Sequence, residues 1–256
     1  MNARRLAIVL ALLGLGLALV GCRGKQAPSL ATSPELKSPR TLRWYRWTTE
    51  FRADSSLFDQ SLAPEALRSA RFVLRASVKG DRVIPDRERA LTTAEPVAVE
   101  PRESITIGND RWNRIGNGPW RVGGEAFPAA RAYFGGTANL SARAILEPTE
   151  TSVVAGLRQE MASMSYREEA VVTGTAWRCT LRPEQVTAVL ADPSLNPFPV
   201  LKALPAVRID VWVDEQRKVL VGLRVAGDTA ARPEAFLLKV RVTEIEPDGL
   251  RIDPPR

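Results

Sequence analysis

The sequence predicts an α+β fold in which a curved antiparallel sheet is covered on one side by short helices. The strongest sign lies near the C-terminus, where apolar residues occupy every second position in 207–213, 219–225 and 236–242. Such alternation is typical of strands with one buried face, and the short turn at 214–218 predicts an antiparallel meander. Helical periodicity is confined to short segments in the middle of the chain. These helices are therefore the elements available to cover the apolar side of the sheet.

The first 22 residues predict export and a lipid anchor. Arg4 and Arg5 precede an apolar run at 6–20, which is shorter than the roughly 20 residues of a membrane-spanning helix and has the length of a signal-peptide core. The run ends in Leu-Val-Gly before Cys22, which resembles the lipobox of bacterial lipoproteins, where the cysteine thiol receives diacylglycerol and becomes the N-terminus after cleavage. We expect a signal peptide at 1–21 and lipidation of Cys22. The alternative is a secreted protein with a chance cysteine at its cleavage site.

Residues 22–40 predict a flexible tether, because Pro, Ser and polar residues dominate there without a hydrophobic period. One domain is expected at 41–256, and its first half consists mainly of strands. Pro85, Pro96 and Pro101 should interrupt some of them, because proline donates no hydrogen bond to a neighbouring strand. In order, we expect a strand at 42–47, a short helix at 63–70, a strand at 72–78, weaker strands at 87–93 and 97–99, and a hairpin joining 105–107 to 112–115.

The middle of the chain changes from strand to helix periodicity. Val153, Leu157, Met161 and Met164 are spaced by four, four and three residues, which places them in one stripe of an amphipathic helix. We interpret the stripe as packing on the sheet, and the alternative is a membrane-facing surface. Around it we expect helices at 128–134 and 139–146, strands at 166–172 and 175–181, and a helix that begins at Pro183 and ends before Asp192 and Pro193.

The composition excludes several kinds of chemistry. The chain contains no His, which rules out Ser-His-Asp and Cys-His nucleophilic systems and His-based zinc sites. If Cys22 is acylated, Cys179 has no disulfide partner, so we interpret it as a small buried apolar residue. The adjacent Glu168 and Glu169 would point to opposite faces of a strand, which does not suit an acid/base pair. We predict no catalytic residues, no metal and no cofactor.

The distribution of charge bears on the partners of the protein. The formal net charge is +7, and Arg4 and Arg5 lie in the expected signal peptide, which leaves +5 in the mature chain. The basic residues are scattered singly rather than clustered, so we predict no nucleic-acid partner. A mild positive balance suits a protein held beside anionic lipid headgroups.

The order of the expected elements resembles that of the LolA-like lipoprotein superfamily, which includes the LppX/LprG-type lipoproteins of mycobacteria. The local matches are the hairpin at 105–112 with the Gly-Pro-Trp at 118–120, and the Val-Trp-Val-Asp-Glu at 211–215. Together the matches and the element order cover roughly residues 41–245. The resemblance implies an unclosed half-barrel whose concave face is covered by helices, with a cavity between them that holds acyl chains of lipids or lipoproteins. It implies no catalytic residues.

From this resemblance we expect an apolar cavity between the helical stripe and the sheet. Tryptophan rings on the strands could line this cavity and contact acyl chains. For any single tryptophan, the alternative is that its ring packs in the ordinary core of the sheet. Trp212 lies on the strand face opposite Val211 and Val213, so we expect it at the outer surface. The candidates for lining the cavity are Trp44, Phe72, Leu74, Val153, Leu157, Met161 and Met164.

The sequence thus favours a lipid-anchored cell-envelope protein that binds a hydrophobic ligand, such as a lipid or acyl chain. We expect it to catalyse no reaction and to take part in lipid or lipoprotein transport. Its expected place is the outer face of the bacterial cell membrane, or the outer membrane of a host that has one. Two alternatives stay open. One is an envelope sensor or scaffold that binds another protein, and the other is a hydrolase with an unrecognised site.

Overall fold

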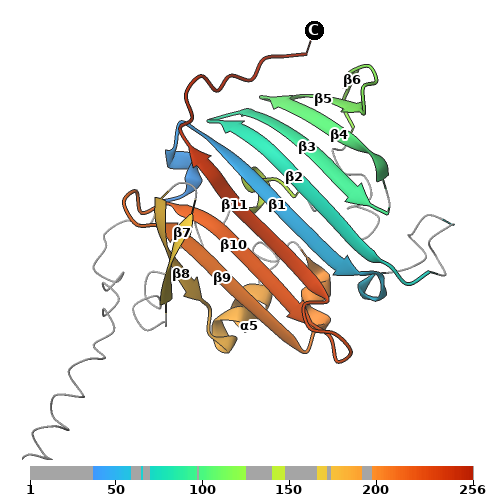
Figure 1. The fold of residues 1–256 in the computed structure, drawn as a ribbon, viewed down its shortest axis with the longest axis vertical. Helices are drawn as coiled ribbons and strands as arrows, with labels where there is room; N and C mark the ends of the chain where they lie inside the picture. The colour runs from blue at the N-terminus through green and yellow to red at the C-terminus, as the bar shows by residue number, and fades with distance from the viewer. Residues whose placement is uncertain are drawn as a thin grey trace, which may run out of the picture.

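The computed structural model describes residues 37–58, 65, 70–96, 98–124, 140–147, 166–171, 174–191 and 198–255. In these residues eleven strands form one sheet, and every neighbouring pair is antiparallel (Figure 1). The strands are β1 (Trp44–Asp54), β2 (Val73–Val83), β3 (Arg87–Glu95), β4 (Ala98–Ile107), β5 (Asp110–Ile115), β6 (Arg121–Val122), β7 (Tyr166–Val171), β8 (Gly174–Thr180), β9 (Ala206–Asp214), β10 (Leu220–Asp228) and β11 (Phe236–Ile245).

The helical elements are short. They are η2 (Pro39–Thr41), η3 (Ser55–Leu57), α3 (Ala142–Ile145), α5 (Pro183–Ala191) and η8 (Pro199–Ala203). No helix among the described residues is long and apolar enough to cross a membrane.

The first and last strands of the chain meet in the middle of the sheet. The strand order is β6-β5-β4-β3-β2-β1-β11-β10-β9-β8-β7, so β1 pairs with both β2 and β11 (Figure 1). Because β6 and β7 lie at opposite edges and do not pair, the sheet stays open. The predicted fold class is confirmed: a curved, unclosed antiparallel sheet carries short helices on its concave face.

The two faces of the sheet differ in chemistry. The concave face is defined by alternate residues of β1, of which Tyr45, Trp47, Thr49, Phe51 and Ala53 are buried. Their neighbours in β2 and β11 point to the same side, because residues directly opposite in an antiparallel pair share a face. The convex face carries the other set, which is rich in arginine and carboxylates.

The C-terminal meander of β9, β10 and β11 is confirmed, but its convex face is more buried than alternation predicts. Trp212, which we expected at the outer surface, does face the convex side but is only 3% exposed. The guanidinium carbons of Arg178 and Arg241 lie 5.6 and 5.2 Å from its ring centroid. Gly222 lies opposite it, so close that an added Cβ would meet the ring at 3.2 Å. The cationic side chains thus cover a tryptophan that the strand pattern leaves exposed.

Pro101 does not interrupt its strand, contrary to our expectation. Residues 98–99 and 105–107 belong to the single strand β4, which pairs with β3 through Ala94 and Ala98 at one end and from Arg102 onward at the other. Between these stretches the register shifts, and pairing with β5 begins only at Arg102. Proline is tolerated at such an irregularity because no ladder hydrogen bond is required of its nitrogen.

The folded body includes the end of the expected tether. The Lys37 amide donates to Lys218 O at 2.7 Å, and the Leu220 amide donates to Lys37 O at 3.0 Å. Ser38 and Pro39 are buried beside this contact. Residues 37–40, which we expected in the tether, therefore belong to the folded body.

Several expected features lie outside the described residues. They are the signal peptide, the lipidation site at Cys22, most of the helix at 63–70, the helix at 128–134, and the stripe of Val153, Leu157, Met161 and Met164.

Candidate functional site

The concave face of the sheet is the candidate binding surface, and it has two parts. Beside η8, whose N-cap is Phe198, it is filled by aromatic rings. The centroid of Phe51 lies 6.2 Å from that of Phe198 and 5.5 Å from that of Phe236, and Phe198 lies 5.3 Å from Phe236. The second part, on β2 and β3, carries small buried side chains instead. They are Ala76, Val78, Ala90, Thr92 and Ala94.

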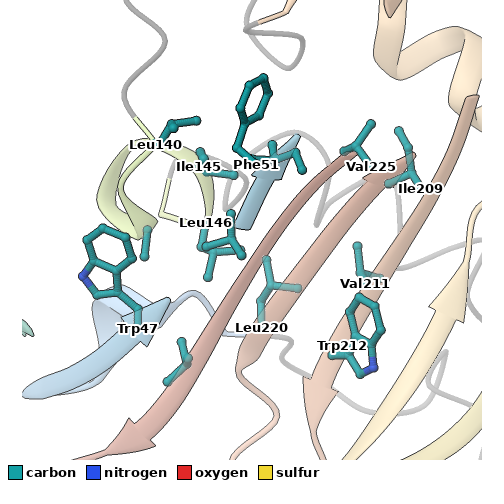
Figure 2. Close-up of a cluster of buried hydrophobic side chains, with 14 of the residues drawn as sticks. Trp47, Phe51, Leu140, Ile145, Leu146, Ile209, Val211, Trp212, Leu220 and Val225 are labelled. Carbon is teal, nitrogen blue, oxygen red and sulfur yellow. The ribbon is translucent and has the colours of Figure 1, made fainter. Parts of the chain in front are cut away.

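The segment 140–147 lies on this face and is held to β1. Thr49 donates a hydrogen bond from Oγ1 to Leu140 O at 2.7 Å. Ser141 caps α3, because its hydroxyl accepts from the Ala144 amide at 3.1 Å. Leu140, Ile145 and Leu146 lie in one cluster with Trp47 and Phe51 (Figure 2). The expected helix at 139–146 is therefore present as a single turn, with its apolar side chains turned to the sheet.

A buried ion pair closes the end of this segment. Both Glu147 and Arg82 are almost fully buried. Arg82 donates from Nε to Glu147 Oε1 at 2.9 Å and from Nη2 to Oε2 at 3.2 Å, and the Tyr45 hydroxyl donates to Oε1 at 2.9 Å. Arg40 approaches Oε2 to 3.4 Å from the surface. We call Tyr45, Arg82, Glu147 and Arg40 the Glu147 cluster.

The Glu147 cluster alters the ionisation of its members. Burial and the neighbouring Glu147 carboxylate raise the pKa of Tyr45 well above its ordinary value, so its hydroxyl stays protonated as a donor. Burial alone would lower the pKa of Arg82, but its hydrogen bonds to Glu147 and the charge of that carboxylate raise it. The Glu147 carboxylate is therefore paired with the Arg82 guanidinium, and this ion pair holds the segment 140–147 to the sheet.

Glu88 lies beside this cluster on the concave face and is only partly satisfied. Burial raises its pKa to about 7, although Arg82, Arg143 and a hydrogen bond with Ser141 act in the opposite direction. Its Oε2 is buried and has no hydrogen-bond partner among the described residues. A carboxyl group in this state can be neutral or charged near physiological pH.

The structure places the predicted lining residues in different surroundings. Leu74 is fully buried in the core on the concave face, and Phe72 is partly buried and packs against that core. Trp44 lies on the convex side of β1, where its Nε1 donates to Pro247 O at 2.8 Å, so it does not line the concave face. The other four candidates, Val153, Leu157, Met161 and Met164, lie outside the described residues.

The sequence analysis missed the polar residues of the concave face. The signal was present in β2, where Arg82 falls in phase with Leu74, Ala76 and Val78. A charged residue at a core position calls for a buried partner. That partner, Glu147, is 65 residues further along the chain, and strand alternation cannot locate it.

The convex face is covered by ion pairs. Asp210 receives hydrogen bonds from Arg178, Arg224 and Thr180 at 3.1, 3.0 and 2.6 Å. Burial raises the pKa of Asp210, but these three hydrogen bonds outweigh it and lower the pKa below its ordinary value. Glu103 is paired with both Arg89 and Arg114 at 2.5 Å.

A groove of about 720 Å³ runs across this convex face. Leu91, which is 44% exposed, contributes an apolar side chain to the lining of the groove. Its other walls include Arg46, Lys79, Pro101, Glu103 and Arg114.

The described residues hold little that would support covalent or metal chemistry. Cys179 is buried, and burial raises the pKa of its thiol to about 12, which agrees with its interpretation as an apolar core residue. No group of three or more potential metal ligands is present in the described part of the chain.

No protein-family model matches the chain, and no curated protein matches its sequence. Among solved structures, the chain is similar to a crystal structure described as a domain of an outer membrane lipoprotein-sorting protein from Vibrio parahaemolyticus. The two sequences are 8% identical, the match covers 81% of this chain and 86% of the other, and the TM-score is 0.22. A likeness at this level assigns no family, so the proposals below rest on the geometry of the chain itself.

Proposed function

We propose that this protein is a lipid-anchored cell-envelope protein, related to the LolA-like lipoproteins, that binds the acyl chain of a lipid or lipoprotein against the concave face of its sheet. The observation that carries the proposal is the small-residue region of β2 and β3, where Ala76, Ala90 and Ala94 occupy core positions. Small side chains on a curved sheet leave volume that other atoms must fill, because protein interiors are packed as densely as organic crystals. An acyl chain is long, thin and apolar, and fits such a strip.

The lipid anchor in this proposal depends on acylation of Cys22. On this proposal residues 1–21 are a signal peptide that is removed, and the acylated cysteine holds the domain on the outer face of the cell membrane or on an outer membrane. Lys37 is the first residue that the structure describes, and it is already paired with Lys218 and Leu220, so at most 15 residues, 22–36, lie between the lipid and the body. Even fully extended they span no more than about 54 Å, which keeps the binding face close to the membrane.

Acylation is tested by Cys22→Ser. Each buried methylene contributes about 0.8 kcal/mol to membrane binding, and two chains hold a protein stably. We expect the Ser variant to be retained as an uncleaved precursor or to lose its acyl chains, as measured by intact mass and by detergent-phase partitioning. The internal Cys179→Ser variant should be processed normally. A Cys22→Ser protein that still carries labelled fatty acid would show that the lipobox assignment is wrong.

Acyl-chain binding is tested with two neighbouring positions that face opposite sides of β3. Ala90 points to the concave face, and Leu91 points to the convex groove. In the mature chain with Cys22→Ser, we expect Ala90→Phe to weaken binding of a fluorescent fatty acid by about tenfold or more, the equivalent of about 1.4 kcal/mol. Leu91→Phe should leave it unchanged. Melting temperatures identify misfolded variants, and Ala90→Val provides a smaller step if Ala90→Phe does not fold.

The outcomes separate the candidate functions. No binding of fatty acid or phospholipid by the unsubstituted protein would contradict the proposal. It would leave the second candidate, an envelope module that binds another protein. The convex groove, with Leu91 exposed between charged side chains, is the observation that favours that second candidate.

A further inference from the structure

The groove on the convex face crosses five neighbouring strands, β1 to β5 (Figure 1). One lining residue from each strand lies directly opposite the next, so these residues form a single row across the sheet: Thr48, Lys79, Leu91, Glu103 and Arg114. Neighbouring strands are about 4.8 Å apart, so the part of the row from Lys79 to Arg114 is roughly 14 Å long at the backbone. The volume of about 720 Å³ lies within the range of ligand pockets.

The groove carries more positive than negative charge. Its lining holds four basic and two acidic residues, a formal surplus of +2: Arg46, Lys79, Arg89 and Arg114 against Asp81 and Glu103. Arg46 is already paired with Asp81 at 3.2 Å and, outside the lining, with Glu244 at 2.7 Å. Lys79 is exposed and forms no ion pair with a described residue, while Arg89 and Arg114 share the single carboxylate of Glu103. The uncompensated charge therefore lies at Lys79, Arg89 and Arg114.

Two of these cations are held in position. Arg89 donates from Nε to Glu103 Oε1 and Arg114 donates from Nε to Oε2, each at 2.6 Å. The guanidinium carbon of Arg114 also lies 4.7 Å from the centroid of the Trp120 ring. A guanidinium has five N–H donors, so contacts with one carboxylate oxygen leave others for a further acceptor. Because the two groups are fixed before binding, little side-chain entropy is lost when an anion binds.

Leu91 places an apolar side chain between the cations. It lies opposite Lys79 on one side and opposite Glu103, the residue that holds Arg89 and Arg114, on the other. A ligand that fits the groove therefore presents an aliphatic group with an acidic group on either side. A free phosphate has no aliphatic group to cover Leu91, and the flat surface of a membrane matches a recessed groove less well than a chain segment does.

An extended peptide has the spacing that the groove requires. In a strand, the side chains at i, i+2 and i+4 point to the same side, and four residues span about 13–14 Å. This span matches the roughly 14 Å from Lys79 to Arg114. An acidic side chain at i would meet Lys79, and one at i+4 would meet Arg114 and Arg89. An aliphatic side chain at i+2 would then lie within about 2 Å of Leu91 along the row.

We propose that the convex groove binds an extended segment of a partner protein in which an aliphatic residue has an acidic residue two positions away on each side. The inference goes beyond acyl-chain binding, because it concerns the opposite face of the sheet. It gives the chemistry of the partner that the second candidate function requires. The two faces are separate, so the protein can hold an acyl chain and this segment at the same time.

The probe is the peptide Ser-Glu-Ser-Leu-Ser-Glu-Ser, titrated into the fluorescently labelled mature chain with Cys22→Ser and followed by thermophoresis. We expect saturable binding at peptide concentrations up to about 1 mM, which weakens as salt is added because exposed charges are screened. Peptides with Gln in place of both Glu, or with Ser in place of Leu, should bind about tenfold or more weakly. No binding of the first peptide, or equal binding of the Gln peptide, would overturn the proposal.

Two pairs of matched variants locate the binding site. Lys79→Gln and Leu91→Ser change the lining of the groove. Arg75→Gln changes an exposed cation on the same strand and face as Lys79 but outside the lining, and Val122→Ser changes an exposed apolar residue outside it. We expect the first two variants to weaken peptide binding by about tenfold and the other two to leave it unchanged. Equal losses in Lys79→Gln and Arg75→Gln would overturn the groove as the site, because they would indicate general attraction by charge.

Fatty-acid binding separates this proposal from the proposed function. All four variants should bind a fluorescent fatty acid as the unsubstituted protein does, and their melting temperatures should stay close to its value. Peptide binding without fatty-acid binding would overturn acyl-chain binding alone, and the reverse would overturn the convex site alone. Binding to phosphatidylglycerol vesicles that Lys79→Gln weakens and Arg75→Gln does not, without peptide binding, would overturn the partner protein in favour of a membrane surface.

Discussion

Replacing Glu147 with Gln is expected to lower the free energy of unfolding by about 3–5 kcal/mol. Glu147 is 2% exposed, and Arg82 donates to both of its carboxylate oxygens. Gln keeps the size of the side chain but leaves the buried Arg82 guanidinium without its hydrogen-bonded counter-charge. Removing one member of a buried pair costs more than the net value of the pair, because the other charge stays desolvated. Urea denaturation at pH 7 measures the change.

The control for this prediction is the other arginine of the Glu147 cluster. Arg40 approaches the same carboxylate at 3.4 Å, but its side chain is 57% exposed. Solvent screens such a pair, so Arg40→Gln should cost less than about 1 kcal/mol. Similar losses for Glu147→Gln and Arg40→Gln would contradict the assignment of Arg82 as the principal partner. The double variant Arg82→Met with Glu147→Leu should recover part of the loss, since it removes both buried charges.

Glu88→Gln is expected to remove a pH dependence of stability. Burial raises the pKa of Glu88 in the folded protein to about 7, against an ordinary value near 4.5. Between these pH values the folded state binds a proton that the unfolded state releases, so the free energy of unfolding falls as pH rises from about 4.5 to about 7. The loss is on the order of 3 kcal/mol, at 1.36 kcal/mol for each pH unit of difference. Gln does not titrate, so the Glu88→Gln variant should not lose this stability as the pH rises.

The groups that face Glu88 determine the size of this effect. Burial is the main cause of the raised pKa, and Glu147 adds to it, while Arg82, Arg143 and Ser141 oppose it. We expect Glu88→Gln to be close to wild type in stability at pH 4.5 and more stable above pH 7, as measured by melting temperature across that range. Glu95→Gln, at an exposed position of the same strand, should show no such pH-dependent gain. A constant difference between Glu88→Gln and wild type from pH 4.5 to 8 would contradict the prediction.

Strand periodicity predicted the sheet well because it depends on neighbours in sequence. The alternation in β9, β10 and β11 follows directly from one face being buried, and the hairpin of β4 and β5 follows from Gly108, whose φ of +59° favours glycine. The helix at α5 begins at Pro183 as expected, because proline fits the first helical position. These features require only local chemistry.

Local patterns failed where long-range contacts determine the environment. Trp212 was expected at the surface, but arginines of two other strands cover it. Trp44 was expected in a cavity, but its strand turns it to the convex side and to Pro247, 203 residues away. Pro101 was expected to break a strand, but a register shift accommodates it. In each case the deciding neighbour lies outside the strand that carries the residue.

The sequence by itself determined the open antiparallel sheet, the positions of most strands, the absence of histidine chemistry and the prediction of a lipidated Cys22. The tertiary structure alone decided which charges are buried and which polar atoms meet. Arg82 and Glu147 come together only because strand register and the segment 140–147 place them on one concave face. Periodicity records whether a position is buried, but the partner of a buried charge is set by the pairing of strands that are distant in the chain.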